Sequence, residues 1–273
     1  MKAYSGNLTK MVTTSTSPVS YSLPIGEHLL PLNPLIGKKL TLEFHGRINC
    51  IACNRETKNS FQQGYCFPCT RKLAQCDLCI VKPSLCHSHK GTCREPKWGD
   101  MHCMIPHIVY LSNASGLKVG ITRKSQVPTR WIDQGAIAAM PVFEVANRRI
   151  SGLIEAEMSK TMSDRTNWRN MLKNKIDPID LAQEKQNVVK AFIPIIEKIK
   201  AEFGPDAIEL INHSQLFEFD YPVMAYPSSI KSLSFDKQNK IEGILEGIKG
   251  QYLIFDCGVI NIRKFSGYWV ECY

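Results

Sequence analysis

The pattern of apolar and polar positions in the first 49 residues is typical of short β-strands. Residues 40–44 alternate apolar and polar side chains with a period of two, as a half-buried strand does. Four prolines between positions 18 and 34 interrupt this segment with turns. We therefore expect a β-rich segment over residues 1–49.

Strand and helix patterns alternate after position 105. Two predicted strands, 108–111 and 118–121, flank the turn-forming residues 112–116, and this arrangement predicts a β-hairpin. With the elements that follow, the hairpin gives the order β-β-α-β-α. The later elements are a helix that begins near Pro128, a strand over 142–145 and a helix over 150–162.

The chain beyond position 177 is predicted to contain one helix and then to return to strands. Apolar positions at helical spacing predict a long helix over 178–205, which a Gly-Pro pair ends. Three strand patterns between 252 and 270 are separated by turns that contain glycine. The two β-rich ends of the chain are therefore able to pair into one sheet or small barrel.

Length and composition narrow the class of protein. The 273 residues suffice for one large domain or two small ones, and 44% hydrophobic with 22% charged residues is ordinary for a globular protein. These values exclude global disorder, a collagen-like repeat and a coiled-coil rod. No apolar run approaches the roughly 20 residues of a membrane span, and the N-terminus lacks the apolar core of a signal peptide. We expect a soluble, cytoplasmic protein that does not bind a membrane.

The distribution of charge favours a polyanionic partner. Lys and Arg number 34 against 25 Asp and Glu, a net charge of +9. Residues 115–175 hold eleven basic and five acidic residues, which is +6 of that excess. Such a basic surface most often binds nucleic acid, which is the partner we expect here. If eight cysteines bind two zinc ions as thiolates, each site carries −2 and the net charge falls to +5, so the local excess is the stronger argument.

Nine of the eleven cysteines lie between positions 50 and 103. The first group has the spacing C-x2-C-x12-C-x2-C, which supplies four soft ligands from two tight turns to a tetrahedral zinc ion. Disulfides are disfavoured because the chain has no export signal, and a redox C-x-x-C pair usually occurs once, at the start of a helix. The predicted zinc ligands of this group are Cys50, Cys53, Cys66 and Cys69.

A second group has the spacing C-x2-C-x6-C-x6-C and predicts a second zinc site. Its ligands are taken as Cys76, Cys79, Cys86 and Cys93. Other side chains compete for this ion, and a cross-braced pairing of the knuckles stays open; the competitors are His87, His89, His102, Cys103 and His107. A site of four thiolates is closed to substrate, so both zinc ions are predicted to be structural.

The segment 106–172 resembles the GIY-YIG endonuclease superfamily. The Ile-Val-Tyr of 108–110 and the Lys-Val-Gly of 118–120 are similar to its paired-strand signature, although the first motif lacks Gly-Ile and the second has Lys where many members have Tyr. An arginine at the first helix, a glutamate on the second and an asparagine beyond it also agree; these are Arg130, Glu155 and Asn167. The resemblance implies an α+β fold in which a zinc-binding cysteine block precedes a β-β-α-β-α nuclease core.

By this resemblance Glu155 holds one catalytic Mg²⁺ or Mn²⁺, and Arg130 clamps the scissile phosphate. Tyr110 positions or activates the attacking water, Lys118 adds positive charge near the same phosphate, and Gly120 lets the backbone approach closely. The predicted activity is metal-dependent endonucleolytic cleavage of DNA, or of RNA. Each side chain also has an ordinary structural role available, as a core tyrosine or as half of a surface ion pair.

Two further sets of residues complete the predicted site. Glu157 is the alternative metal ligand, but it lies roughly 200° around the helix from Glu155, so the two do not easily share one ion. Trp168 either stacks on a base or packs in the core. The residues predicted to bind nucleic acid are Arg123, Lys124, Arg165, Asn167, Trp168 and Arg169.

Over its whole length the chain also resembles a bacterial family catalogued as domain of unknown function 2797, on residues 91–96 and 130–136. Two other function classes stay open, a non-catalytic nucleic-acid-binding protein and a zinc-scaffolded protein-interaction module. A thiol-redox enzyme is the least favoured. The predicted parts are a β-rich segment (1–49), a double zinc-binding block (50–105), a GIY-YIG-like core (106–177), a long helix (178–205) and a C-terminal β-rich domain (206–273).

Overall fold

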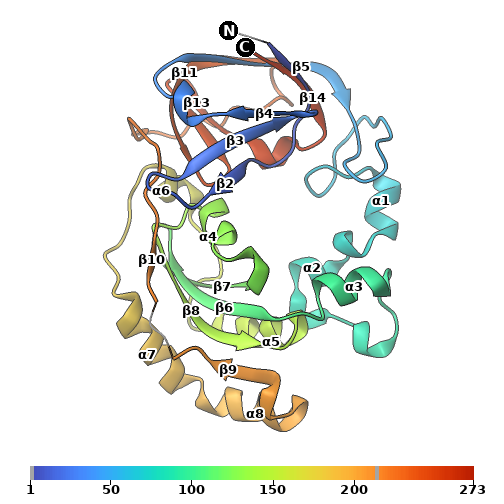
Figure 1. Cartoon of the computed structure of the whole chain (residues 1–273), viewed down its shortest axis with the longest axis vertical. Coiled ribbons are helices and arrows are strands. Elements are labelled where there is room, and N and C mark those ends of the chain that lie inside the picture. The colour runs from blue at the N-terminus through green and yellow to red at the C-terminus, as the bar shows by residue number, and fades with distance from the viewer. Residues whose placement is uncertain (1–2, 213–214) are drawn as a thin grey trace.

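The computed structural model, which describes residues 3–212 and 215–273, is a mixed α+β fold with three sheets (Figure 1). The largest sheet has six strands in the order β1-β14-β5-β11-β12-β13. Its strands come from both ends of the chain. They are β1 (Tyr4–Asn7), β5 (Lys39–Ile48), β11 (Lys240–Lys249), β12 (Tyr252–Phe255), β13 (Gly258–Asn261) and β14 (Tyr268–Cys272).

Strand β5 joins the two ends, because it pairs with β14 on one side and with β11 on the other. Leu42 lies opposite Cys272 in one pairing and opposite Ile241 in the other, and all three side chains are buried. A second sheet of three strands packs against the same core, and we call the two sheets together the terminal β domain. The three strands are β2 (Val12–Thr14), β3 (Ser20–Ile25) and β4 (His28–Pro31).

A third, five-stranded sheet forms the middle of the molecule, and we call it the core sheet. The predicted hairpin is present in it, as β6 (His107–Asn113) paired antiparallel with β7 (Leu117–Arg123). Strand β8 pairs with the other edge of β6 and with two later strands. The elements that follow the hairpin are α4 (Thr129–Asp133), β8 (Ala138–Val145), α5 (Arg148–Met158), α6 (Trp168–Leu172), β9 (Ile208–Leu210) and β10 (Phe217–Glu218).

The single long helix expected over 178–205 is in fact two helices, α7 (Leu181–Ala191) and α8 (Ile193–Phe203). The break falls at Phe192, whose backbone angles (φ −103°, ψ 7°) lie outside the helical region. Pro194 explains it, because proline has no N–H to donate and its ring collides with the carbonyl four residues earlier. At the first turn of a new helix the same proline is well tolerated.

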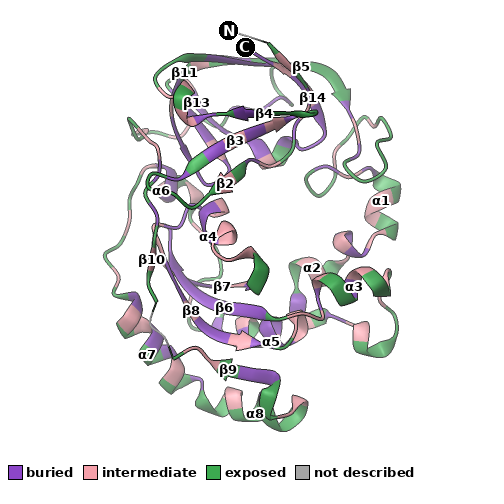
Figure 2. Ribbon diagram, viewed as in Figure 1, coloured by how far each residue is buried: buried purple, intermediate pink, exposed green. Residues whose placement is uncertain are grey.

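Both faces of β6 are covered, and all seven of its residues are buried (Figure 2). Ile108 and Tyr110 face a core shared with the terminal β domain. Val109 and Leu111 face a second core, which contains buried side chains of α5, α7 and α8. The alternation along β6 therefore places Tyr110 on the side of the sheet that meets the terminal β domain.

The cysteine block, residues 50–105, docks onto helix α5. Its helices are short, and between them lie turns and 3-10 segments such as η3 (Pro83–Leu85). A Cβ at Gly152 of α5 would collide with the backbone nitrogen of Ser84 and with Pro83 Cβ, 2.5 Å away. The close approach of this turn to α5 therefore requires glycine at position 152. The helices of the block are α1 (Phe67–Lys72), α2 (Leu78–Val81) and α3 (Pro96–His102).

Within the described part of the chain, none of the helices combines the length and the apolar character that crossing a membrane requires.

Replacement of Gly152 by alanine tests this docking. In an exposed helix the change would stabilise by about 1 kcal/mol. Here we expect a loss of about 1–3 kcal/mol of unfolding free energy, because the methyl group overpacks the contact with η3. Urea unfolding measures the change, and Ala156→Ser, on an exposed position of the same helix, is the control. Equal effects of the two substitutions would contradict the close contact.

Candidate functional site

A polar cavity of about 760 Å³ lies where the core sheet, the cysteine block and the terminal β domain meet. The core contributes all five candidate catalytic residues, the block contributes Tyr65 and its neighbours, and the β domain contributes Lys10 and Arg263. The five are separated by up to 45 positions in the sequence, and the fold brings them to one site. They are Tyr110, Lys118, Gly120, Arg130 and Glu155.

Tyr110 and Gly120 are direct partners across the β6–β7 pairing. A Cβ at Gly120 would come within 2.6 Å of the Tyr110 ring and hydroxyl, so only glycine leaves the ring its place. The phenol is buried and packs edge-on against Trp131, with ring centroids 5.5 Å apart. Burial raises the pKa of Tyr110 to about 12, although Arg130 opposes the shift. Tyr110 is therefore a neutral hydrogen-bonding group near pH 7.

Gln134 joins Tyr110 to Lys118. Its Oε1 accepts a hydrogen bond from the Tyr110 hydroxyl at 3.0 Å and another from Lys118 Nζ at 2.7 Å. Only 3% of the surface of Lys118 is exposed. Burial and the nearby Arg130 charge lower the pKa of Lys118 to about 8, which brings its protonation equilibrium near the physiological range.

Two carboxylates that also line the cavity are those of Glu155 on α5 and of Asp164 beyond it. Burial, followed by the negative charge of Asp164, raises the pKa of Glu155, whereas Arg148, Lys118 and Arg130 lower it. A bridge between Lys118 and Ser163 brings Asp164 here, because the chain leaves α5 and runs beside β7. Carboxylate oxygens are the kind of donor that Mg²⁺ and Mn²⁺ prefer.

Glu157, the alternative ligand, does not line the cavity. Its carboxylate pairs with Lys160 at 2.5 Å on the outer side of α5.

Positive charge exceeds negative charge around the cavity, with six basic and three acidic side chains in its lining. Arg130 has no carboxylate within 4 Å in the described part of the chain. A guanidinium without an ion pair, beside a basic wall, suits a phosphate group. The basic residues are Lys10, Lys118, Arg123, Arg130, Arg148 and Arg263, and the acidic ones are Asp133, Glu155 and Asp164.

Asp133 fixes helix α4, and with it Arg130, against the terminal β domain. Its buried carboxylate accepts hydrogen bonds from Lys10 Nζ and from Gln251 Nε2, each at 2.8 Å. Gln251 also accepts a hydrogen bond from the Met11 backbone at 2.8 Å. Residues from both ends of the chain therefore hold the α4 side of the cavity.

Of the six residues predicted to bind nucleic acid, the cavity includes only Arg123. Lys124 is paired with Glu144 at 2.8 Å, and Arg165 is 91% exposed. Asn167 caps α6, where its side chain accepts from Asn170 N. The half-buried Trp168 stacks on Tyr252 (5.7 Å between centroids), and the Arg169 guanidinium lies 4.4 Å over the Trp168 ring.

The first cysteine group forms a compact cluster in which all four sulfurs lie within 4.8 Å of one another. Tetrahedral bonds of about 2.3 Å to zinc require sulfurs about 3.8 Å apart, and Cys53 and Cys66 Sγ are 3.7 Å apart. Burial would raise the pKa of Cys50, but backbone N–H groups of Cys53, Cys66 and Ala52 lower it to about 6. This cluster of Cys50, Cys53, Cys66 and Cys69 could hold a zinc ion.

The second cysteine group is only partly assembled as predicted. Cys79, Cys86 and Cys93 line one small cavity, and Cys103 lines it as well, but Cys76 does not. Of the competing histidines only His87 reaches this cavity. His102 instead stacks on Trp98 with centroids 4.3 Å apart, and His107 Nδ1 is bonded to the Ile105 carbonyl at 2.7 Å.

Several residues of the large cavity were not predicted as site residues from the sequence, among them Gln134, Asp164 and Arg148. Gln134 follows a short helix, and Asp164 follows an α-helix. Gln134 lies within residues 130–136, which carry the family resemblance, but that resemblance assigns it no role, and Asp164 belongs to no motif. Arg148 is the first residue of α5, and its Nη2 donates to the Ile80 carbonyl at 2.6 Å. The excess of basic residues over 115–175 includes Arg148, but it does not indicate which of these arginines lines the cavity.

Comparison with known proteins yields one match. The sequence model of the family described as "Protein of unknown function (DUF2797)" matches residues 37–270. No curated protein and no solved structure matches the chain.

Lys118 should make stability depend on pH in the alkaline range. Between pH 8 and 10.5 the unfolded chain binds a proton at Lys118 that the folded chain has released. The unfolding free energy of the wild type should therefore rise by up to about 3 kcal/mol, relative to Lys118→Met, as pH increases through this window. Urea unfolding at several pH values measures the difference. The exposed Lys160→Met is the control, and an equal pH dependence of both variants would contradict the shift.

Proposed function

The chain belongs to the family described as protein of unknown function (DUF2797), and because that description assigns no chemistry, we propose from the site itself that the protein is a divalent-metal-dependent nuclease with a GIY-YIG-like core. Its substrate in this proposal is a phosphodiester of DNA, or of RNA. The zinc-binding cysteine block is structural in the same proposal.

The observation that carries the proposal is the convergence of Tyr110, Lys118, Gly120, Arg130 and Glu155 on one basic cavity. A tyrosine, a lysine and a glycine come from a strand pair, an arginine from the first helix and a glutamate from the second. Phosphodiester hydrolysis requires positive charge at the phosphate oxygens, a placed water and, in most enzymes, a divalent cation. The cavity offers side chains suited to each of these needs.

Glu155 and Asp164 are the residues that would hold Mg²⁺ or Mn²⁺. Burial and then the negative charge of Asp164 raise the pKa of Glu155. This supports the role, because a bound cation would relieve the repulsion between the two carboxylates. When bound, the ion supplies charge neutralisation and polarisation at the phosphoryl oxygen.

The remaining roles follow from the protonation states. Arg130 presents a planar guanidinium to two phosphate oxygens. Lys118, whose pKa is lowered to about 8, adds positive charge and is able to exchange a proton. Tyr110 stays protonated and places its hydroxyl, and Gln134 orients both side chains through its Oε1.

The Glu155→Gln variant tests the enzyme. Wild type is expected to cut at least one of supercoiled, linear, branched and single-stranded DNA or RNA when Mg²⁺ or Mn²⁺ is added. Glu155→Gln should be slower by about 100-fold or more, because a carboxylate that holds the cation is lost. Gel electrophoresis of the products measures cleavage, and binding is measured on the same substrates at several salt concentrations.

Glu157→Gln is the matched control, since Glu157 lies on the same helix, pairs with Lys160 and does not line the cavity. It should cleave at the wild-type rate. Salt-dependent binding by wild type without any cleavage would replace the nuclease with a non-catalytic nucleic-acid-binding protein. Absence of both binding and cleavage would remove nucleic acid as the partner.

A further inference from the structure

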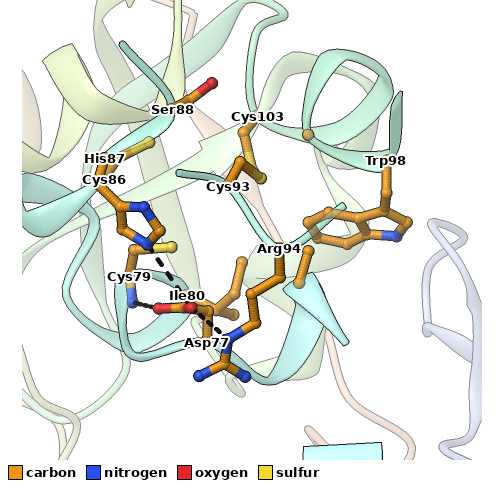
Figure 3. Close-up of a pocket in the computed structure, with 12 residues that line it drawn as sticks. Asp77, Cys79, Ile80, Cys86, His87, Ser88, Cys93, Arg94, Trp98 and Cys103 are labelled. Carbon is orange, nitrogen blue, oxygen red and sulfur yellow. Dashed lines mark hydrogen bonds and ion pairs between the residues drawn. The ribbon is translucent and has the colours of Figure 1, made fainter. Parts of the chain in front are cut away.

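Four buried or half-buried thiols surround a small cavity in the cysteine block, apart from the first cluster (Figure 3). Its volume is about 20 Å³, which is room for a single small species such as one ion. The thiols come from α2, from the turns on both sides of η4 (Ser88–Lys90), and from the end of α3. They are Cys79, Cys86, Cys93 and Cys103.

Cys76 lies outside this cavity, although it belongs to the same C-x-x-C pair as Cys79. Its backbone carbonyl accepts a hydrogen bond from Gln62 Nε2 at 3.2 Å.

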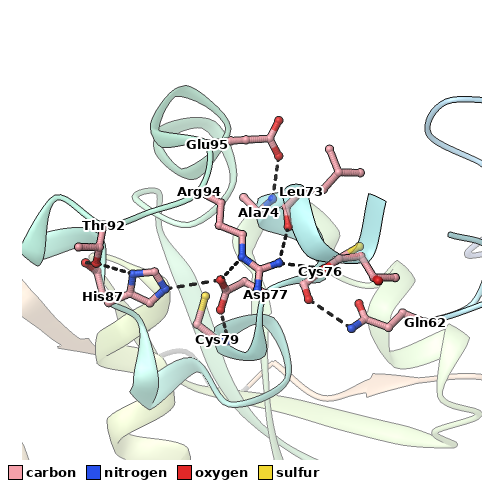
Figure 4. A network of polar contacts seen from close by, with 11 residues as sticks. Gln62, Leu73, Ala74, Cys76, Asp77, Cys79, His87, Thr92, Arg94 and Glu95 are labelled. Atoms are coloured by element: carbon pink, nitrogen blue, oxygen red, sulfur yellow. Dashed lines mark hydrogen bonds and ion pairs between the residues drawn. The ribbon is translucent and has the colours of Figure 1, made fainter. Parts of the chain in front are cut away.

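The non-cysteine candidates are already committed to protein contacts (Figure 4). The Asp77 carboxylate pairs with Arg94 Nε at 2.6 Å and accepts from the Cys79 backbone N–H at 3.2 Å. His87 shares a hydrogen bond with Thr92 Oγ1 at 2.7 Å through Nδ1, and its Nε2 lies 3.6 Å from Asp77. Asp77, Cys79 and His87 each place a ligand atom within 4.8 Å of the others and could together hold an ion, but the carboxylate and the imidazole already have these protein partners.

We propose that Cys79, Cys86, Cys93 and Cys103 bind one structural Zn²⁺ as a tetrathiolate, and that Cys76 is not a ligand. Four thiols that line a space of one ion, without a disulfide among the described cysteines, supply the donor set of a closed zinc site. Their sulfurs do not lie within 4.8 Å of one another as those of the first cluster do, so a bound ion would draw them together. Compared with the ligand set predicted from the cysteine spacing, Cys103 replaces Cys76.

The surroundings compensate the charge of such a site, which is −2 for one Zn²⁺ and four thiolates. Arg148 contacts both ligand-bearing segments. Its backbone N–H donates to the Cys103 carbonyl at 2.8 Å, and its Nη2 donates to the carbonyl of Ile80, next to Cys79. Its buried Nε has no hydrogen-bond partner in the described residues. The ion would therefore fix the wall of the large cavity that carries Arg148, whether or not that cavity cleaves nucleic acid.

Zinc content of the purified full chain tests the ligand set. Wild type should contain two zinc ions per chain by mass spectrometry of the metal. Cys103→Ser and Cys53→Ser should each fall from two to one, because each removes a ligand of a different site. Cys76→Ser is the matched control, as a buried cysteine of the same block, and it should keep two, as should His87→Ala.

A cobalt-substituted Cys103→His variant keeps the test decisive if Cys103→Ser does not fold, because histidine also binds zinc and cobalt. Its thiolate-to-cobalt charge-transfer absorption should be weaker than in wild type, with two ions still bound. The proposal is overturned if Cys76→Ser or His87→Ala loses an ion, if Cys103→Ser keeps two, if the Cys103→His spectrum is unchanged, or if wild type holds only one.

Discussion

The contact between Tyr110 and Gly120 is the constraint on which the site depends. The central strand β6 is covered on both faces, so a large side chain on it has to find room inside the sheet pair. Gly120 supplies that room directly across the pairing. The tyrosine hydroxyl then reaches the edge of the cavity, and Gln134 and Lys118 gather around it. A buried polar group of this kind stabilises the fold only when its hydrogen bonds are made.

Buried ionisable groups whose charged forms are disfavoured lie together around the Tyr110 hydroxyl. Burial lowers the pKa of Lys118 and raises the pKa of Glu155, which means that the folded state disfavours the charged form of both. Three separate parts of the chain enclose these groups, and each part contributes a charge or a hydrogen bond. Such an arrangement costs stability, and sites that bind ligands or perform chemistry are where proteins tolerate that cost.

The sequence predicted the elements better than the contacts between them. The hairpin at 108–121 and the first cysteine group could be predicted, because turn residues and C-x-x-C pairs are patterns that extend over only a few positions. The break at Phe192 was missed because the helical spacing of the apolar positions continues through Pro194. Asp164 and Gln134 were missed because their places depend on how loops return to the sheet. For the same reason Cys103 stayed one of several possible ligands of the second zinc ion. The spacing of cysteines in the sequence does not show which thiols meet in space, and the position of the Cys103 thiol depends on where α3 ends.

The pairing of β5 with both β11 and β14 has a consequence for how the molecule is made. Strand β5 is ten residues long, and both its neighbours lie beyond position 239. Until those residues have left the ribosome, both edges of β5 are open, which is a state prone to pairing with other chains. The core sheet and the cysteine block have their own local partners and can form earlier. The cavity gains Arg263 and its link to Gln251 only when the late strands join, so synthesis of residues 240–272 both protects β5 and completes the cavity.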